Sequence, residues 1–246
     1  MKRAFKLWFT VLLMAASSHA AQEESVSLKV VIEPSETTQT NTNTKKLTDA
    51  SNVAVWLVPL DSKAASTQIH GPLAKPPRLV QRNKTFEPHV LIIRTGTRVE
   101  FPNKDPFFHN IFSLYDGRRF DLGLYEAGTA RTVMFDRSGV SFLFCNIHAE
   151  MSAIVISVDT PYFSLSDRSG TVNITNVPDG RYQMNIWYER GAPEQLKGLS
   201  RVVTISVAAR DLGTLHILEN PDFTANHKNK YGLDYVPPPN SNYDHP

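Results

Sequence analysis

The chain of 246 residues contains a single cysteine, Cys145, and this scarcity excludes several kinds of structure. One thiol cannot form an intramolecular disulfide, and it cannot supply the second thiolate of a thiolate-bound structural zinc site. The sequence also lacks a Gly-x-Ser-x-Gly nucleophile elbow and a glycine-rich phosphate loop. We therefore expect neither a disulfide-stabilised small domain nor the commonest hydrolase sites.

Long hydrophobic runs are also missing. The apolar stretch Leu7 to Ala16 is well short of the roughly 20 residues that cross a bilayer. It follows three basic residues and precedes Ser18 and Ala20, small residues at the positions that a signal peptidase needs. We therefore predict a signal peptide over residues 1–20, no membrane span, and a mature protein that is periplasmic or secreted.

The sequence has no excess of one charge sign. The chain has 26 basic and 24 acidic residues, and residues 1–20 hold three of the basic ones and no acidic ones, leaving 23 against 24. A nucleic-acid site needs a clustered basic face, and neither the balance nor the distribution of charge provides one. We expect no nucleic-acid partner.

What the sequence does contain is a series of short runs rich in Val, Ile, Phe and Thr, separated by Gly and Pro. This pattern is typical of an all-β protein, and no convincing amphipathic helix longer than a turn or two is present. We expect strands over residues 26–32, 52–60, 78–81, 90–94, 98–101, 111–114, 130–135, 141–145 and 153–158. The polar run 36–46 and the stretch 61–77 are expected to be loops.

The chemically distinctive residues gather around Cys145. His148 and Met151 follow it at intervals of three, and His109 lies upstream in a turn-rich loop between two expected strands. A thiolate, two imidazoles and a weak axial thioether are the ligands of a mononuclear blue-copper site. Met134 is an alternative axial ligand, but it lies in the middle of an expected strand. An interpretation without a metal is also open, because a free cysteine is often simply buried.

The stretch from about Arg78 to Val158 resembles the cupredoxins of the plastocyanin and amicyanin kind. The resemblance is carried by Phe86-Glu87-Pro88, the segment Gly96 to Asp105, His109-Asn110, Gly139 and Cys145-x-x-His148-x-x-Met151. It implies a Greek-key β-sandwich domain over residues 76–158 that binds one copper ion through His109, Cys145, His148 and Met151. It also implies that Asn110 ties the two ligand loops together by hydrogen bonds and that His148 is the exit point for the electron.

Aromatic and aliphatic residues beside the expected ligands predict an apolar surround for the ion. Phe107, Phe108 and Ile147 are expected to form a collar that limits the access of water. The strand before the cysteine departs from the usual family pattern, because Phe142 and Phe144 point away from the face that Cys145 shares. Both faces of this strand are therefore largely apolar, and we expect its outer face to be covered.

The chain beyond Asp159 has a different sequence pattern. We interpret residues 166–187 as a β-hairpin with a turn at Pro178-Asp179-Gly180. Its apolar residues alternate on one face, and they are Val172, Ile174, Tyr182, Met184 and Ile186. The segment resembles the small carboxypeptidase-regulatory or transthyretin-like β-sandwich, in which two further strands precede the hairpin.

Two such strands are available only on the far side of the copper domain. We therefore predict that the copper domain is inserted into a second sandwich made of residues 25–60 and 160–220, since insertion at a loop with close ends costs little. The alternative is that residues 25–60 form an extra N-terminal hairpin on the copper domain. Residues 221–246, with several Pro and Asn, are expected to be an extended or disordered tail.

Three functions fit these features. An exported carrier would pass single electrons between redox partner proteins through copper, and it would be no enzyme and have no catalytic residues. A non-redox copper carrier or sensor would need the same ligands. An envelope ligand-binding protein would depend on the second sandwich and keep the copper domain as an accessory. The complete set of four ligands favours the electron carrier.

Overall fold

The computed structural model describes residues 25–34, 49–61, 75–114 and 116–235, and it is nearly all-β, as predicted. The expected signal peptide, the polar run 36–46, most of the stretch 61–77 and the end of the tail lie outside these residues. Within the described ranges, no helix combines the length and the apolar character that crossing a bilayer requires.

The described elements alternate short strands with turns. In chain order they are β1 (Val26–Glu33), β2 (Ala54–Pro59), β3 (Val80–Arg82), β4 (Thr85–Glu87), β5 (Val90–Arg94), β6 (Thr97–Pro102), β7 (His109–Ser113), β8 (Phe120–Tyr125), β9 (Ala130–Phe135), β10 (Gly139–Phe144), β11 (Ser152–Val158), β12 (Phe163–Leu165), β13 (Thr171–Ile174), β14 (Gly180–Trp187), α2 (Pro193–Leu199), β15 (Arg201–Ile205) and β16 (Asp211–Leu218). The strands that were not predicted include β4, β8 and β12. Two of them are only three residues long, and Gly123 interrupts β8, so their apolar alternation is too short to detect.

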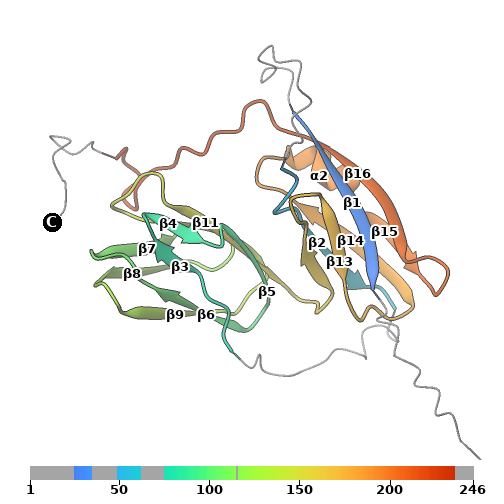
Figure 1. Cartoon of the computed structure of the whole chain (residues 1–246), viewed down its shortest axis with the longest axis horizontal. Helices are drawn as coiled ribbons and strands as arrows, with labels where there is room; N and C mark the ends of the chain where they lie inside the picture. The colour runs from blue at the N-terminus through green and yellow to red at the C-terminus, as the bar shows by residue number, and fades with distance from the viewer. Residues whose placement is uncertain (1–24, 35–48, 62–74, 115, 236–246) are drawn as a thin grey trace, which may run out of the picture.

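Two sheets combine strands from the beginning of the described chain with strands that follow β11. β1 is the middle strand of the sheet β13-β1-β16, and β2 lies between β12 and β14 in the sheet β12-β2-β14-β15. We call these strands with α2 the outer sandwich, and β3 to β11 the central unit (Figure 1). Among the described residues, β1 and β2 pair neither with each other nor with a strand of the central unit, so they do not form a hairpin on it.

The predicted hairpin over residues 166–187 is wrong. β13 pairs with β1 and β14 pairs with β2 and β15, so the two segments lie in different sheets. Their apolar residues nevertheless face one core, which contains Val172, Ile174, Tyr182, Met184 and Ile186. The alternation correctly identified the buried face of each strand, but a buried face is the same whether two strands are paired or packed across a sandwich. The connection after Ile174 therefore crosses between sheets instead of turning within one.

The central unit is a second sandwich with its own core. Its larger sheet has the order β5-β11-β10-β7-β8, and it faces the pairs β3-β4 and β6-β9. Isolated bridges from Arg78 to Glu100 and from Gln81 to Asn103 join those two pairs along one side. The core between the layers includes Phe101, Ile111, Phe135, Leu143, Cys145, Met151 and Val155. The unpaired thiol therefore lies inside the packed interior of this unit.

A third apolar cluster joins the two units. Strands β5, β10 and β11 contribute Val90, Phe142 and Ile156 from the central unit, and the outer sandwich contributes Ala54 and Trp187. The rings of Phe142 and Trp187 meet edge to face with centroids 6.3 Å apart. The expectation that the outer face of β10 is covered is thus confirmed, and the outer sandwich provides part of the cover.

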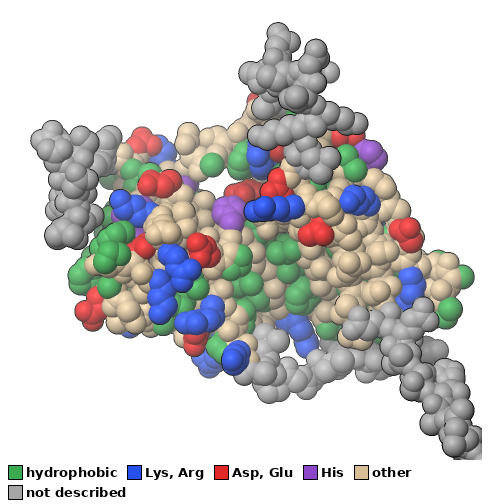
Figure 2. Space-filling model, in the orientation of Figure 1, with side chains coloured by type: hydrophobic (Ala, Val, Ile, Leu, Met, Phe, Trp, Pro, Cys, Tyr) green, Lys and Arg blue, Asp and Glu red, His purple; other side chains and the backbone are tan. Residues whose placement is uncertain are grey.

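Charged side chains of both signs are interspersed on the surface. Figure 2 shows Lys and Arg near Asp and Glu on both units of the face that it draws. Ion pairs such as Arg78–Glu100 at 3.2 Å and Arg210–Asp179 at 2.6 Å have at least one exposed partner. Exposed pairs contribute about 0–1 kcal/mol each, so the stability of the fold depends mainly on the apolar cores.

The sheet pairings predict how fragments of the chain behave. Residues 76–158 should fold alone because the central unit has a closed core, whereas residues 160–220 should not, because they lack the strand between β13 and β16. Without β1 and β2, the apolar faces that these strands cover become wet at a cost of about 25 cal/mol per Å². Fusing residues 25–60 to 160–220 should restore folding, as measured by thermal melting and NMR dispersion. Cooperative folding of 160–220 alone would contradict the prediction.

A histidine at the contact between the units predicts a pH dependence of stability. The two ring nitrogens of His89 lie 3.1 Å from the carbonyl oxygen of Ser152 and 2.7 Å from a carboxylate oxygen of Glu189. Both acceptors are satisfied at once only by the doubly protonated imidazolium. The hydrogen bond to Glu189 is the main reason that the pKa of His89 is raised above 6.5. The resulting stabilisation is complete below about pH 6.5 and is lost as the pH rises through the raised pKa.

We therefore expect Glu189→Gln to lower the melting temperature by about 1–3 °C at acidic pH and by less at alkaline pH. The measurement is thermal unfolding of variant and wild type over a series of pH values. Glu100→Gln is the control, because its partner Arg78 is an arginine and not a histidine, so its effect should change less over this pH series. A constant difference between Glu189→Gln and the wild type across the series would contradict the prediction.

Candidate metal centre

The metal-ligating residues predicted from the sequence lie at one end of the central unit. Cys145 directly follows β10, and Met151 directly precedes β11, so the short loop between them is held by the pairing of these two strands. The N–H of Cys145 donates to the carbonyl of Met151 at 3.1 Å, and the N–H of Met151 donates to the carbonyl of His148 at 3.1 Å. His109 was expected on a loop but is the first residue of β7, where it pairs with Tyr125 of β8.

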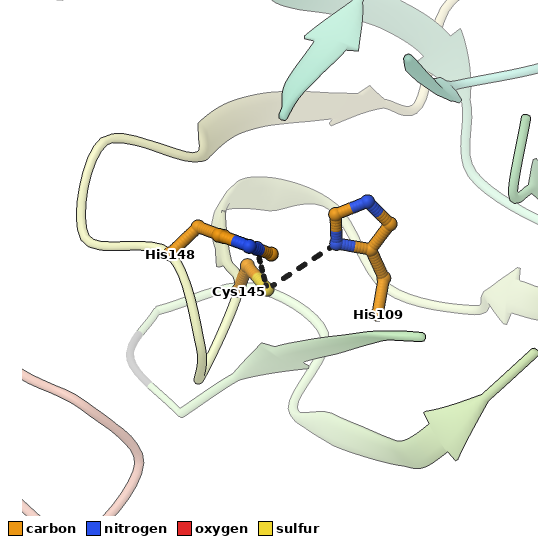
Figure 3. Close-up of side chains that lie close together, drawn as sticks. All are labelled: His109, Cys145 and His148. Carbon is orange, nitrogen blue, oxygen red and sulfur yellow. Dashed lines mark hydrogen bonds between the residues drawn. The ribbon is translucent and has the colours of Figure 1, made fainter. Parts of the chain in front are cut away.

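Three of the four predicted ligands meet around one sulfur. The Sγ atom of Cys145 lies 3.8 Å from Nδ1 of His109 and 3.6 Å from Nδ1 of His148, as Figure 3 shows. The three ligand atoms all lie within 4.8 Å of one another. Cys145 and His109 are fully buried, and His148 is partly exposed. The Nδ1 atoms of both histidines therefore face a buried thiol, one from the start of β7 and the other from the loop after β10.

These separations fit a metal ion between the three atoms. An ion bonded to sulfur at about 2.3 Å and to nitrogen at about 2.0 Å, with about 120° between the bonds, separates the two ligand atoms by about 3.7 Å. The two observed sulfur–nitrogen distances bracket this value. A thiolate with two imidazoles in a trigonal arrangement is the donor set of a blue-copper centre. The two sulfur–nitrogen distances thus suit a copper ion held between the thiol and the two imidazoles.

The fourth predicted ligand, Met151, is fully buried in the same core cluster as Cys145. Its backbone bonds to Cys145 and His148 keep it within the loop that carries both. The alternative thioether, Met134, lies in β9 opposite Arg98 and is only partly buried. The placement of Met151 favours it over Met134, and its role as axial ligand stays a prediction.

A carboxylate that was not predicted determines the orientation of His109. Nε2 of His109 lies 2.8 Å from Oδ2 of Asp105, and both side chains are buried. Because a carboxylate accepts, Nε2 carries the proton and Nδ1 keeps its lone pair directed at Cys145. Such a carboxylate partner fixes the tautomer of a ligand histidine and raises its basicity. Asp105 therefore prepares His109 to act as a ligand.

A tight turn holds Asp105 in its charged form. Asn83 and Lys84 connect β3 to β4, and their positive φ values of 53° and 57° are those of a two-residue hairpin turn. The N–H groups of Asn83 and Lys84 donate to the two carboxylate oxygens of Asp105 at 2.6 and 3.0 Å. Burial alone would raise the pKa of Asp105, but these donors and His109 outweigh it and hold the pKa below its usual value. The carboxylate therefore stays negative.

His148 is kept in the form that a ligand requires. Partial burial, with the neighbouring His109 and Lys84 as smaller causes, lowers the pKa of His148 from 6.5 to about 4. A histidine must be neutral to donate a lone pair to a metal ion. At neutral pH His148 is therefore already in its binding form, and no proton has to leave its ring.

The predicted apolar collar is partly realised. The ring of Phe107 lies 5.1 Å from that of His109 and 5.7 Å from that of His148, measured between centroids. Phe108 and Ile147 are 57% and 47% exposed, so they lie at the surface beside the loop instead of shielding its interior. The centre thus has an aromatic ring on one side, and an exposed apolar residue precedes each of the two histidines in the sequence.

The expected role of Asn110 is not what the structure shows. Its Nδ2 donates to Oδ1 of Asp121 at 2.8 Å, and its buried Oδ1 has no hydrogen-bond partner within the part of the chain that is described. The side chain of Asn110 therefore contacts Asp121 of β8 and does not bridge the two ligand loops directly. A family pattern predicts the residue type at a position, but it does not predict which partner the rest of the chain supplies.

Comparison with family models and with curated proteins finds no match. Among solved structures, a purple cupredoxin from Nitrosopumilus maritimus is 23% identical, with a TM-score of 0.31, over 33% of this chain and 99% of its own. A copper-containing nitrite reductase from Thermus scotoductus SA-01 is 25% identical, with a TM-score of 0.34, over 41% of this chain and 27% of its own. An oxidized amicyanin variant is 15% identical, with a TM-score of 0.32, over 37% and 90%. Because these scores are low, the nature of the site depends on its own geometry.

The link from Asp105 to His109 predicts a specific loss on substitution. Asp105→Asn keeps the size of the side chain but removes the negative charge that orients the imidazole of His109 and raises its basicity. We expect the affinity for Cu(II) to fall by about 10- to 100-fold, measured by competition with a chelator. Asp136→Asn, at an exposed carboxylate that pairs with Arg118, is the control and should leave the affinity unchanged. Equal affinities of Asp105→Asn and wild type would show that the carboxylate does not act on the ligand.

Proposed function

We propose that this protein is an exported electron carrier that binds one copper ion through His109, Cys145, His148 and Met151. The observation that carries the proposal is the buried Sγ of Cys145 with two Nδ1 atoms at 3.6 and 3.8 Å. Bound copper would supply a one-electron couple, Cu(I)/Cu(II). The partners would be redox proteins that donate and accept this electron, and the expected signal peptide supports a periplasmic or secreted location.

The packing of the ligand residues supports electron transfer as the use of the ion. Cys145 and His109 lie at the ends of two strands of one sheet, and both side chains are fully buried. The interior of a protein is close-packed, so these side chains have little room to move. A site that holds its ligands in place exchanges an electron with little rearrangement. Four ligand residues also complete the coordination of the ion, whereas a catalytic site keeps an open position, which supports a carrier and not an enzyme.

The surface around His148 supports it as the place where the electron enters or leaves. His148 is the most exposed of the three side chains that meet at the centre, and Ile147 next to it is 47% exposed. Phe108, on the segment before His109, is 57% exposed. Where exposed apolar side chains form a contiguous patch, the patch often marks a contact with another protein. A redox partner that docks on this surface would reach the imidazole of His148 directly.

Loading the mature protein with Cu(II) tests the proposal. We expect an intense visible absorption band and a reversible one-electron potential, because the thiolate of Cys145 gives the charge-transfer band. Cys145→Ser should remove the band but leave the melting temperature of the metal-free protein within a few degrees, since the core is apolar. His216→Gln, in the outer sandwich where the imidazole pairs with Glu33, is the control and should keep the band.

Each outcome has a clear meaning. A band that survives in Cys145→Ser would show that the thiol is not a ligand. Copper uptake without a reversible potential would favour a copper carrier or sensor over an electron carrier. If the wild type took up no copper, the function would have to lie in the outer sandwich.

A further inference from the structure

The chain after β16 does not end on the outer sandwich. It runs back over the central unit and reaches the loop that carries Cys145 (Figure 1). The hydroxyl of Tyr235 donates to the carbonyl oxygen of Cys145 at 2.6 Å. The backbone N–H of Lys230 donates to Oδ1 of Asn146 at 3.0 Å. We call residues 227–235 the C-terminal strap, and it thus binds two consecutive residues where β10 ends.

The strap also reaches the segment that carries His109. The ammonium group of Lys230 lies 2.8 Å from Oδ2 of Asp121, and the other oxygen of Asp121 accepts from Asn110 at 2.8 Å. Asn110 is the neighbour of His109. A single residue of the strap therefore joins the two ligand segments, one through its side chain and the other through its backbone. This is the link that Asn110 does not make directly.

Aromatic contacts hold the strap against the end of β10. The ring of His227 lies parallel to that of Phe144, with centroids 4.1 Å apart and 27° between the planes. The ring of Tyr235 meets His227 edge to face at 5.3 Å, and its hydroxyl lies 3.3 Å from Nδ1 of His227. Phe144 is the last residue of β10 and precedes Cys145. The strap therefore covers the outward face of β10 at the point where the ligand loop begins.

We propose that the C-terminal strap is a positioning element of the metal centre, and that Tyr235 and Lys230 act as its positioning residues. The inference rests on the proposed function, because it concerns how the copper ligands are held. Tyr235 fixes the backbone of Cys145 and polarises its peptide group, and Lys230 ties the Cys145 loop to the His109 segment. In this way the outer sandwich, from which the strap extends, contributes to the centre that lies in the other unit.

The test compares matched variants of the full-length mature protein. Tyr235→Phe removes the hydroxyl that donates to the carbonyl of Cys145, and Tyr182→Phe removes one that donates to the carbonyl of Pro178 in the outer sandwich. Lys230→Met removes the ammonium at Asp121, and Lys228→Met removes one that pairs with Asp234, inside the strap. Each member of a pair makes the same chemical change, so differences between members report the contact with the ligand segments.

Two kinds of measurement are needed. On the Cu(II) protein, the visible band, the EPR hyperfine splitting, the midpoint potential and the rate of copper loss to a chelator are recorded. On the metal-free protein, the rate at which dithiobis(nitrobenzoate) modifies Cys145 reports how often the ligand loop opens. We expect Tyr235→Phe and Lys230→Met to raise both rates by about five- to tenfold, the effect of one lost hydrogen bond, and to shift the spectra and the potential. Tyr182→Phe and Lys228→Met should match the wild type in these readouts.

The outcomes separate this inference from the proposed function. If the wild type showed no charge-transfer band, the proposed function would fail, while the thiol modification rates would still test the strap. If Tyr235→Phe and Lys230→Met only lowered the melting temperature, with spectra, potential and thiol reactivity like those of their controls, the strap would be structural cover and the inference would be overturned.

Discussion

Strand β10 is packed on both faces, one fully buried and the other partly buried, and the position of the ligand loop depends on this packing. One face contributes Leu143 to the core of the central unit, and the other places Phe142 against Trp187 and Phe144 against His227. A shift of one residue in register would exchange these two faces and place each side chain in the wrong environment. The strand is therefore held in one register, and Cys145, which follows it, is brought to a fixed point inside the unit.

Hydrogen bonds orient the ligand residues that apolar packing brings together. Packing places the imidazole of His109 near the thiol, but it does not decide which nitrogen carries the proton. Asp105 decides this, and it stays charged because the turn of Asn83 and Lys84 directs two N–H groups at it. The residues that orient His109 thus include a hairpin turn that contributes no predicted ligand.

The segment that follows the outer sandwich also helps to hold the ligand loop in place. The outer sandwich uses strands from before and after the central unit, so the chain leaves it once to build that unit and leaves it again after β16. After β16 the chain passes beside β10 and contacts Cys145 and Asn146. Residues 227–235, which belong to the segment expected to be an extended or disordered tail, contact the ligand segments. Their composition gave no sign of this, because single side chains and backbone N–H groups make the contacts.

The sequence by itself determined the features that a few neighbouring residues encode. Alternation identified the strands and their buried faces, including the two apolar faces of β10. The spacing of Cys145, His148 and Met151 was sufficient to predict a ligand loop, since one short turn carries all three. Only the tertiary structure decided which distant segments meet: that β13 and β14 lie in different sheets, that Asp105 orients His109, and that Lys230 replaces the direct bridge expected of Asn110. Periodicity describes which face of a segment is buried, whereas the partner of that face depends on packing among segments far apart in the chain.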